Sequence, residues 1–254
     1  MNVITPSSFM KTKPDENSEL ETECLFGEAV QLLDSQSEWS YCKLLTDNYL
    51  GWVKKKDLGF SSSITHRVVT NRSFLLEKND IKSNPICYLP LGAQLSVKKI
   101  KSQWSEVRLS KNDNQELAFI PSNHIIKIDD KVKDWVGVAE ALIGTPYRWG
   151  GRNSIGLDCS ALLQLSYQTF GQHIPRNTND QISLQKEIVT DIDKLKRGFV
   201  VFWKGHVGIM VDELNCIHAN AYHMKTIVEP LHDIIFRMGS QYPIIKIMNF
   251  NNKI

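Results

Sequence analysis

The pattern of hydrophobic and polar positions changes near residue 129. Before that point, short alternating runs such as 29–33 and 95–100 are separated by polar turns, which is typical of small antiparallel β structures. From Asp129 onward, apolar residues first recur at helical spacing and then return to short alternating runs. The sequence therefore predicts small β domains followed by an α+β domain.

The β-rich half repeats itself. Gly27 and Gly92 are 65 positions apart, and so are Trp39 and Trp104, with similar residues around each pair. Several matches at one offset favour a duplicated unit. Each copy has about 60 residues, near the lower limit for an independent core, so we expect the copies to pack on each other or on the rest of the chain.

A Gly-Phe-Ser-Ser-Ser segment at 59–63 is the expected linker between the two copies. The expected domains are residues 1–60, residues 64–128 and residues 129–254.

Two helices are predicted at the start of the last domain. Apolar spacing favours a first helix that follows Asp129 and is stopped by Gly144. A second helix is expected from Asp158, a good N-cap residue, to about Phe170, ending at Gly171. A shorter helix is expected near 178–186, and strands at 199–203, 206–211, 216–220 and 244–248. Helices packed on an antiparallel sheet would result.

Composition excludes several function classes. A net charge of +2 gives no sign of a nucleic-acid partner, and no apolar stretch is long enough to cross a membrane. The first residues lack the basic start and apolar core of a signal peptide. Five cysteines are spread widely, without a disulfide framework: Cys24, Cys42, Cys87, Cys159 and Cys216. A reducing cytoplasm is therefore the expected location.

Cys159 is the candidate nucleophile. A glycine-rich run, residues 144–158, leads to this cysteine at the start of an apolar helix, where the helix N-terminus can stabilise a thiolate. The alternative is a small buried side chain, the usual fate of a free cysteine. The polar neighbours Asp158 and Ser160 favour the catalytic interpretation.

His206 and His218 lie in two predicted strands that form a hairpin. With a turn centred on Asp212, the two histidines would be direct cross-strand partners, close enough for a hydrogen bond. Both would stand on the face away from the apolar core. The alternatives are two unrelated histidines, or a metal site formed with Cys159 and Cys216. Since the close-spaced ligand pairs of zinc sites are missing, we expect neither metal nor cofactor.

These three residues suggest a cysteine-dependent hydrolysis. His206 would take the thiol proton and later protonate the leaving amine, while His218 would hold the His206 ring in its productive tautomer. The backbone amide of Cys159 is well placed for an oxyanion hole. The hydroxyl of Tyr147 is a further candidate donor there, with simple packing as its alternative.

The second half of the chain resembles the NlpC-type cysteine peptidases. The motifs that carry the resemblance are Thr-Pro-Tyr-Arg-Trp-Gly-Gly at 145–151, Leu-Asp-Cys-Ser at 157–160, Pro-Arg-Asn-Thr at 175–178, Gly-His-Val-Gly-Ile at 205–209 and Ile-His-Ala at 217–219. They span about half of the chain in the family's order. The two N-terminal units resemble bacterial SH3-like domains more loosely.

The resemblance implies a papain-like fold preceded by two small SH3-like barrels. It also implies hydrolysis of the bond between γ-D-glutamate and a diamino acid, diaminopimelate or lysine, in peptidoglycan peptides. In members with N-terminal SH3-like domains, those domains can narrow the cleft so that a free L-alanine amine is required. The substrate partner would then be a murein peptide, L-Ala-γ-D-Glu-diamino acid.

The same resemblance suggests substrate-binding residues. Asp158 would bind the amine with help from the hydroxyl of Thr178, and Ser160 and Tyr147 belong to the same centre. Tyr49 is a candidate contact from the SH3-like side, with packing against Trp52 as its alternative.

Two other functions remain open from the sequence. The first is a wall-binding protein whose peptidase domain is catalytically idle. The second is an enzyme with the same fold that hydrolyses another amide or an ester. The favoured hypothesis is a cytoplasmic enzyme that recycles cell-wall peptides.

Overall fold

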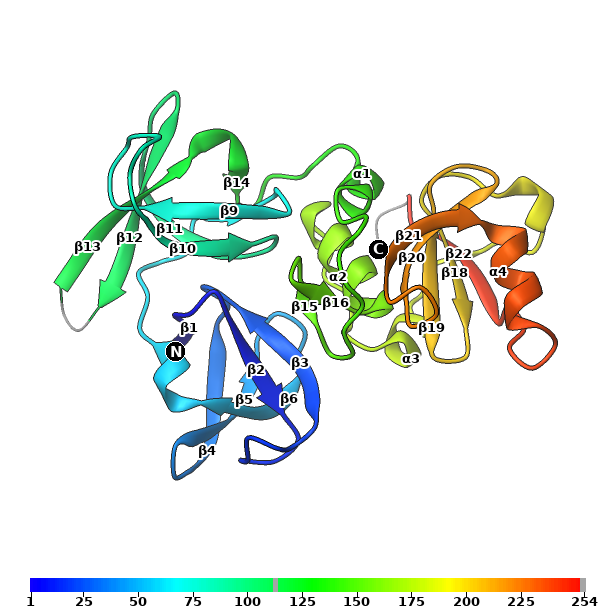
Figure 1. Ribbon diagram of the computed structural model, residues 1–254, viewed down its shortest axis with the longest axis horizontal. Helices are drawn as coiled ribbons and strands as arrows, with labels where there is room; N and C mark the ends of the chain where they lie inside the picture. The colour runs from blue at the N-terminus through cyan, green and yellow to red at the C-terminus, as the bar shows by residue number, and fades with distance from the viewer. Residues whose placement is uncertain (112–113, 252–254) are drawn as a thin grey trace. The chain divides into compact units, whose positions relative to one another are not determined.

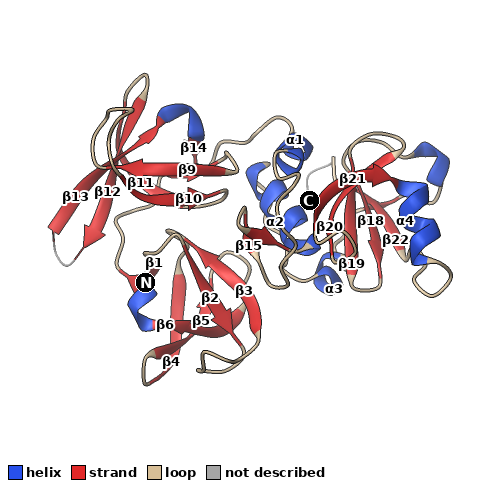
Figure 2. Ribbon diagram, viewed as in Figure 1, coloured by secondary structure: helices blue, strands red, loops and turns tan. Residues whose placement is uncertain are grey.

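The computed structural model describes residues 1–111 and 114–251 (Figures 1 and 2). Residues 112–113 and 252–254, which fall within the second and third expected domains, lie outside the described residues. The chain forms two compact units. Unit 1 contains residues 1–131 and 152–154, and unit 2 contains residues 132–151 and 155–254.

The first half of unit 1 is a small β module. Its elements are β1 (Asn2–Val3), β2 (Ser7–Lys11), β3 (Leu20–Leu25), β4 (Val30–Gln36), β5 (Trp39–Leu44), β6 (Leu50–Lys54), the 3-10 helix Lys55–Asp57 and β7 (Leu58–Gly59). Strands β3, β2, β6, β5 and β4 form one antiparallel sheet in that order, while β1 pairs with β7. Their inward side chains, including Met10, Cys24 and Leu44, form one apolar core.

The second half of unit 1 repeats this plan. Its elements are β8 (His66–Val68), β9 (Arg72–Leu76), β10 (Pro85–Pro90), β11 (Gln94–Ile100), β12 (Trp104–Lys111), β13 (Asn114–Pro121), the 3-10 helix Ser122–His124 and β14 (Ile125–Lys127). They form one sheet with the order β10, β9, β13, β12, β11, β8 and β14. Residues 60–65, between the modules, carry neither helix nor strand.

The predicted duplication is confirmed element by element. Trp39 begins β5 and Trp104 begins β12. Gly27 and Gly92 follow β3 and β10, and both have positive φ angles, 78° and 86°. The two modules also touch, as expected, because the amide of Gln94 donates to the carbonyl of Phe26 at 2.8 Å.

A three-residue segment from the glycine-rich part of the chain belongs to unit 1. The side chain of Arg152 is fully buried and donates to both carboxylate oxygens of Glu28, at 2.7 and 2.9 Å. Glu23 accepts from the backbone amide of Arg152 at 2.7 Å and from the side-chain amide of Asn153 at 2.9 Å. Nothing in the hydrophobic pattern indicated that residues 152–154 complete the buried polar groups of the first β module.

Unit 2 contains four helices among its described residues: α1 (Trp135–Glu140), α2 (Cys159–Thr169), α3 (Thr178–Gln181) and α4 (Leu231–Met238). α2 follows its N-cap residue Asp158 as predicted and is followed by Gly171 with a φ angle of 75°. α1 and α3 are shorter than expected. α4 was not predicted.

The sheet of unit 2 is antiparallel, as expected. Its strands are β17 (Glu187–Ile188), β18 (Phe199–Trp203), β19 (His206–Met210), β20 (Asn215–Asn220), β21 (Lys225–Pro230) and β22 (Lys246–Asn249), in the order β17, β22, β18, β19, β20, β21. Strands β17 and β21 were missed in the sequence. The short strands β15 (Arg152–Asn153) and β16 (Gly156–Leu157) and the 3-10 helix Ile192–Lys194 complete the elements.

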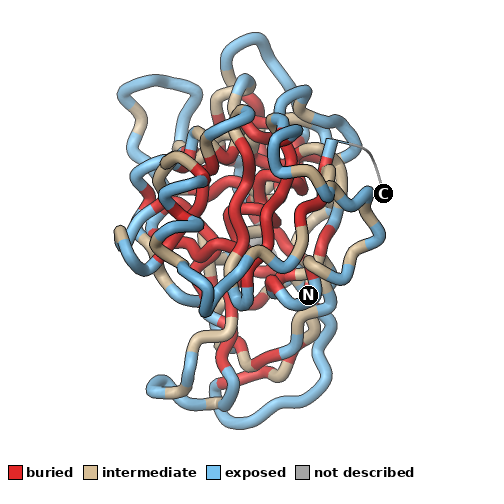
Figure 3. Tube along the Cα trace, turned by 90° about the vertical axis from the view of Figure 1, so that its right-hand side faces the viewer, coloured by how far each residue is buried: buried red, intermediate tan, exposed pale blue. Residues whose placement is uncertain are grey.

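Both faces of this sheet are covered. α2 packs against β19 and β20, and Figure 1 shows α4 on the opposite side of the sheet. Leu231 and Ile234 of α4 share a buried cluster with Met210, Cys216 and Trp203 of the sheet. Figure 3 shows the resulting pattern of buried trace surrounded by exposed loops. Among the residues the structure describes, no helix has the length and apolar character that crossing a membrane would need.

Candidate active site

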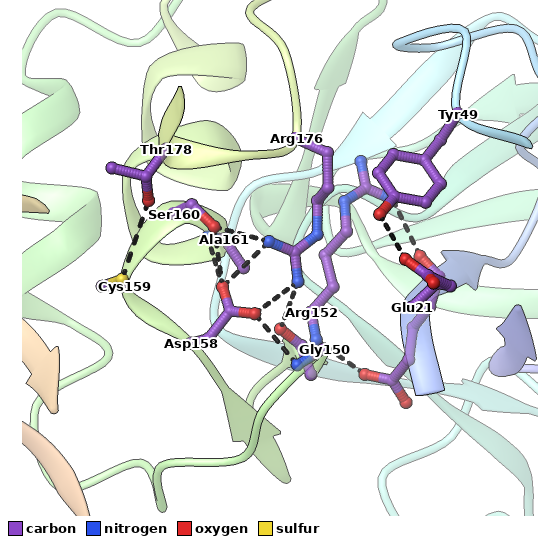
Figure 4. A network of polar contacts seen from close by, with 12 residues as sticks. Glu21, Tyr49, Gly150, Arg152, Asp158, Cys159, Ser160, Ala161, Arg176 and Thr178 are labelled. Carbon is purple, nitrogen blue, oxygen red and sulfur yellow. Dashed lines mark hydrogen bonds and ion pairs between the residues drawn. The ribbon is translucent and has the colours of Figure 1, made fainter. Parts of the chain in front are cut away.

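Cys159 is the first residue of α2, and its thiol is almost completely enclosed, with 7% of the residue exposed. Asp158 caps the helix by accepting from the amide of Ala161 at 2.9 Å. The backbone amide of Val207, the residue after His206, hydrogen-bonds to the Cys159 sulfur. The hydroxyl of Thr178 lies 4.0 Å from the same atom (Figure 4). The thiol therefore lies beside the start of β19.

Burial dominates the electrostatics of Cys159. Together with the adjacent carboxylate of Asp158, burial raises the pKa of the thiol to about 11. The Val207 amide, the Thr178 hydroxyl and the charge of Arg176 oppose it only in part. The Cys159 thiol is thus protonated near neutral pH, whereas its helix position alone suggests a thiolate.

The two histidines are joined as the sequence suggested, but through a different register. His206 Nε2 lies 2.8 Å from His218 Nδ1, and the ring centroids are 5.0 Å apart. Ile209 pairs with Ile217, and Met210 pairs with Cys216. The hairpin is therefore centred on residue 213, not on Asp212, so the histidines are diagonal neighbours on one face and not direct partners.

The expectation that this face lies away from the apolar core is wrong. His218 is only 1% exposed, and it shares its face of β20 with Cys216, which packs under α4. The unpredicted α4 covers this side of the sheet. His218 consequently sits in a poorly hydrated environment, while His206, at the start of β19, is partly exposed at the surface.

Both rings are neutral. The pKa of His206 is lowered to about 3, mainly by burial and to a smaller extent by the neighbouring ring of His218 and the charge of Arg237. Burial also lowers the pKa of His218, although the carboxylate of Glu229 opposes this. The Val207 amide, one residue after His206, lies on the Cys159 sulfur, and a neutral imidazole in this region can serve as the general base for the protonated thiol.

Sequence reasoning missed the groups beyond His218. His218 Nε2 lies 2.7 Å from Glu229 Oε1, and Arg237 donates to both oxygens of that carboxylate. Glu229 lies on β21 and Arg237 on α4, two neighbouring elements that were not predicted. The signal that could have located α4 is the helical spacing of Leu231, Ile234, Ile235 and Met238, and no motif marks Glu229.

Asp158 is surrounded by donors. Arg176 donates to both of its oxygens, at 2.9 and 2.7 Å, and the hydroxyl of Ser160 donates to one of them at 3.0 Å. The amides of Gly150 and Ala161 add two more hydrogen bonds. Figure 4 shows this arrangement around the carboxylate. The ion pair with Arg176 was not anticipated, although this arginine belongs to a motif that was recognised.

The remaining predicted site residues fall in different units. Tyr147 lies in unit 2 and interacts electrostatically with Cys159 and Asp158. The pKa of its phenol is raised to about 12, mainly by burial and to a smaller extent by these two groups. It therefore stays protonated and is able to donate. Tyr49 lies in unit 1, where its hydroxyl donates to Glu21 at 2.7 Å (Figure 4). A role for Tyr49 in substrate binding stays a prediction.

A metal site was the main alternative for these residues. Within residues 1–111 and 114–251, no three His, Cys, Asp or Glu side chains are grouped so that they could hold a metal ion. Cys159, His206, His218 and Cys216 therefore do not form such a group.

A nucleophilic cysteine at the start of a helix, packed on an antiparallel sheet that carries two linked histidines, defines a papain-like cysteine hydrolase. Comparison with known families gives the particular class. Residues 144–237 match the NlpC/P60 family, and residues 10–58 match the bacterial dipeptidyl-peptidase SH3 domain. The chain is an NlpC/P60 cysteine peptidase with N-terminal SH3-like domains.

Similar proteins extend over most of the chain. A dipeptidyl-peptidase 6 from Lysinibacillus sphaericus is 27% identical over 236 residues, covering 86% of each chain. A γ-D-glutamyl-L-lysine dipeptidyl-peptidase from Bacillus cereus is 26% identical and covers 85% of this chain and 72% of its own. The crystal structure of an NlpC/P60 family protein from Bacillus cereus has a TM-score of 0.82 at 18% identity and covers 99% of both chains, so the fold is shared.

Proposed function

We propose that this enzyme hydrolyses the bond between γ-D-glutamate and a diamino acid, lysine or diaminopimelate, in peptidoglycan peptides that begin with a free L-alanine. The observations that carry the peptidase chemistry are the hydrogen bond between His206 and His218 and the hydrogen bond from the amide of Val207, the residue after His206, to the Cys159 sulfur. The substrate class is supported by relatives that match most of the chain, among them two named γ-D-glutamyl-L-lysine dipeptidyl-peptidase.

The reaction proceeds by acyl transfer to sulfur. His206 accepts the Cys159 proton as the sulfur attacks the γ-carbonyl carbon of the D-glutamyl residue. The tetrahedral intermediate collapses to a thioester when His206 returns the proton to the leaving amine of the diamino acid. Water, deprotonated by the same imidazole, then hydrolyses the thioester and restores the thiol.

Two donors are available for the oxyanion. The amide of Cys159 belongs to the first turn of α2, where amides have no partner within the helix. The protonated phenol of Tyr147 interacts with the Cys159 charge. Preorganised donors of this kind stabilise the negative charge that develops on the carbonyl oxygen.

Recognition of the substrate amine is the least direct step. Asp158 supplies a negative charge beside the nucleophile, but its oxygens already accept from Arg176, Ser160, Gly150 and Ala161. An ammonium group bound here would have to share an oxygen with one of these donors. The Asp158 and Thr178 assignments for the amine therefore stay predictions.

We place this activity in the recycling of cell-wall peptides in the cytoplasm, where free L-alanyl peptides would be the substrate. The wide spread of five cysteines without a disulfide framework supports this location.

The test is turnover of synthetic peptides by the full chain. L-Ala-γ-D-Glu-diaminopimelate and L-Ala-γ-D-Glu-L-Lys report the preferred diamino acid, and their N-acetylated forms report the requirement for the amine. We expect cleavage of the free peptides, at least tenfold slower cleavage of the acetylated ones (about 1.4 kcal/mol in transition-state binding), and none by Cys159→Ala. Equal turnover of free and acetylated peptides would contradict the specificity, and cleavage of simple esters alone would point to another hydrolase.

A further inference from the structure

Glu229 occupies a special position behind the two histidines. On the β20–β21 ladder it pairs directly with Cys216, and Cys216 shares a face of β20 with His218. Glu229 and His218 are therefore diagonal neighbours, with Glu229 Oε1 2.7 Å from His218 Nε2. The Glu229 side chain is 12% exposed, so water competes little for this contact.

The carboxylate of Glu229 is ionised and serves only as an acceptor. Arg237 donates to its two oxygens, and His223 Nε2 lies 3.3 Å from one of them. Burial by itself raises the pKa of Glu229, but the hydrogen bonds from Arg237 and His218 lower it to about 2. Because an ionised carboxylate has no hydrogen to offer, the 2.7 Å contact requires a hydrogen on His218 Nε2.

Asn220 does not reverse this assignment. Its side-chain nitrogen lies 3.0 Å from His218 Nε2, because its oxygen accepts from the amide of His223 at 2.7 Å. A neutral amide nitrogen at 3.0 Å is a weaker constraint than a shorter contact with a charged oxygen. The carboxylate therefore decides the tautomer.

The tautomer of His218 fixes that of His206. A neutral His218 with its hydrogen on Nε2 has a free lone pair on Nδ1, which accepts a hydrogen bond from His206 Nε2 at 2.8 Å. The hydrogen of a neutral His206 is thereby held on Nε2. Nδ1 of His206 then has a lone pair, and this tautomer can take a proton from Cys159.

We propose that Glu229 is a positioning residue of the catalytic site, which sets the tautomers of His218 and His206 so that His206 Nδ1 is the base for Cys159. The line Glu229–His218–His206–Cys159 extends the three-residue arrangement by a fourth group, and Arg237 holds that group in place. The catalytic consequence rests on the proposed peptidase reaction, but the tautomers do not.

The first test therefore uses no substrate. Nitrogen-15 NMR of the histidine rings in the full chain distinguishes protonated from bare ring nitrogens at neutral pH. We expect His206 and His218 both to carry hydrogen on Nε2 and none on Nδ1. Hydrogen on Nδ1 of His218 in the unmodified enzyme would overturn the proposal, whatever the peptide assays show.

The second test compares three variants with the L-Ala-γ-D-Glu-diamino acid peptides. Glu229→Leu removes the acceptor and Glu229→Gln retains an oxygen without the charge. Ile234→Val is the matched control for packing, because Ile234 lies on α4 in the buried cluster that also contains Cys216, the cross-strand partner of Glu229. We expect kcat to fall about 10- to 100-fold in Glu229→Leu, as for other partners that orient a functional histidine, less in Glu229→Gln, and not in Ile234→Val, with KM unchanged throughout.

Two outcomes of the variant test would count against the proposal. An unchanged kcat in both Glu229 variants would show that the carboxylate does not matter to the reaction. A parallel change of kcat and KM that Ile234→Val reproduces would show a packing effect only. Absence of turnover by the unmodified enzyme would instead refute the substrate, while the NMR result would still test the tautomers.

Discussion

Cys159 and His206 are both neutral in the free enzyme, because burial raises the pKa of the thiol and lowers that of the imidazole. The pKa of Cys159 is raised to about 11, primarily by burial, and that of His206 is lowered to about 3, again primarily by burial. Proton transfer from sulfur to imidazole is then coupled to substrate binding and attack. Asp158, whose charge disfavours the thiolate, is offset by Arg176, which lies on both of its oxygens.

A prediction about pH follows at the scale of these two residues. Since the Cys159 pKa is raised, the thiolate fraction is small at neutral pH and increases with each pH unit up to about 11. Alkylation of Cys159 by iodoacetamide, followed by mass spectrometry, should therefore be slow at pH 7 and increase about tenfold per pH unit between about pH 7 and 9. A rate that has already reached its plateau at pH 7 would show a resting thiolate and contradict this assignment.

The pH profile of kcat/KM provides an independent measurement of the same pair. It reports the free enzyme, so the acid limb should lie far below the ordinary histidine range, because the His206 pKa is lowered to about 3. The alkylation rate and the acid limb together separate the two pKa values.

At the scale of elements, the helices and strands with the strongest sequence signals were predicted with the most accurate bounds. α2 has a capping aspartate at its start and a glycine after its end, and β18 is a continuous apolar run, so both were located closely. β21 was missed because residues 225–230 do not alternate, and α4 was missed although Leu231, Ile234, Ile235 and Met238 recur at helical spacing, because the pattern extends over only eight residues. Their absence from the prediction is why Glu229 and Arg237 were not found.

The hairpin register illustrates a different limit. The sequence placed His206 and His218 on one face correctly, since an even separation is all that this requires. The centre of the turn depends on its hydrogen bonds: Asp212 accepts from the amides of Leu214 and Asn215, at 2.8 and 2.7 Å. These local side-chain bonds set the turn around residue 213, and hydrophobic alternation does not record them.

The contact between the two β modules gives a prediction at this scale. Gly27 has a φ angle of 78°, and a Cβ atom there would lie 2.0 Å from the carbonyl oxygen of Gln94. Gly144 has a similar φ angle of 84°, but nothing lies within 4 Å of its Cβ position. Gly27→Ala should therefore lower the free energy of unfolding by about 2–4 kcal/mol and Gly144→Ala by about 1 kcal/mol.

Urea denaturation with fluorescence detection measures both variants. Gly144→Ala is the control for the backbone strain that the two substitutions share, so the difference between them isolates the clash with Gln94. If Gly27→Ala and Gly144→Ala lose equal stability, the two β modules move apart at the contact between Gly27 and Gln94 with little loss of free energy.

At the scale of the whole molecule, the chain path links the folding of unit 1 to a segment far away in the sequence. The core and sheets of unit 1 come from residues 1–131, but Arg152 and Asn153 complete its buried polar groups. Glu28 is 1% exposed and Glu23 is 1% exposed, so neither carboxylate can turn to water if these partners are lost. A short segment within the peptidase sequence is therefore a structural part of the first SH3-like module.

The buried pair of Arg152 and Glu28 supplies the prediction that tests this dependence. Removing one partner of a buried ion pair leaves an uncompensated charge, which costs about 3–5 kcal/mol. Arg152→Met in the full chain should therefore lower the unfolding temperature of unit 1 in calorimetry. The double variant Arg152→Met, Glu28→Gln should recover part of the loss, because it removes the stranded charge. The amide oxygen introduced by Glu28→Gln can still accept from the Leu25 amide and the Thr46 hydroxyl, which donate to Glu28 at 2.8 and 2.9 Å. If the double variant is no more stable than Arg152→Met, the pair acts through packing, and the charge of Glu28 is not what Arg152 compensates.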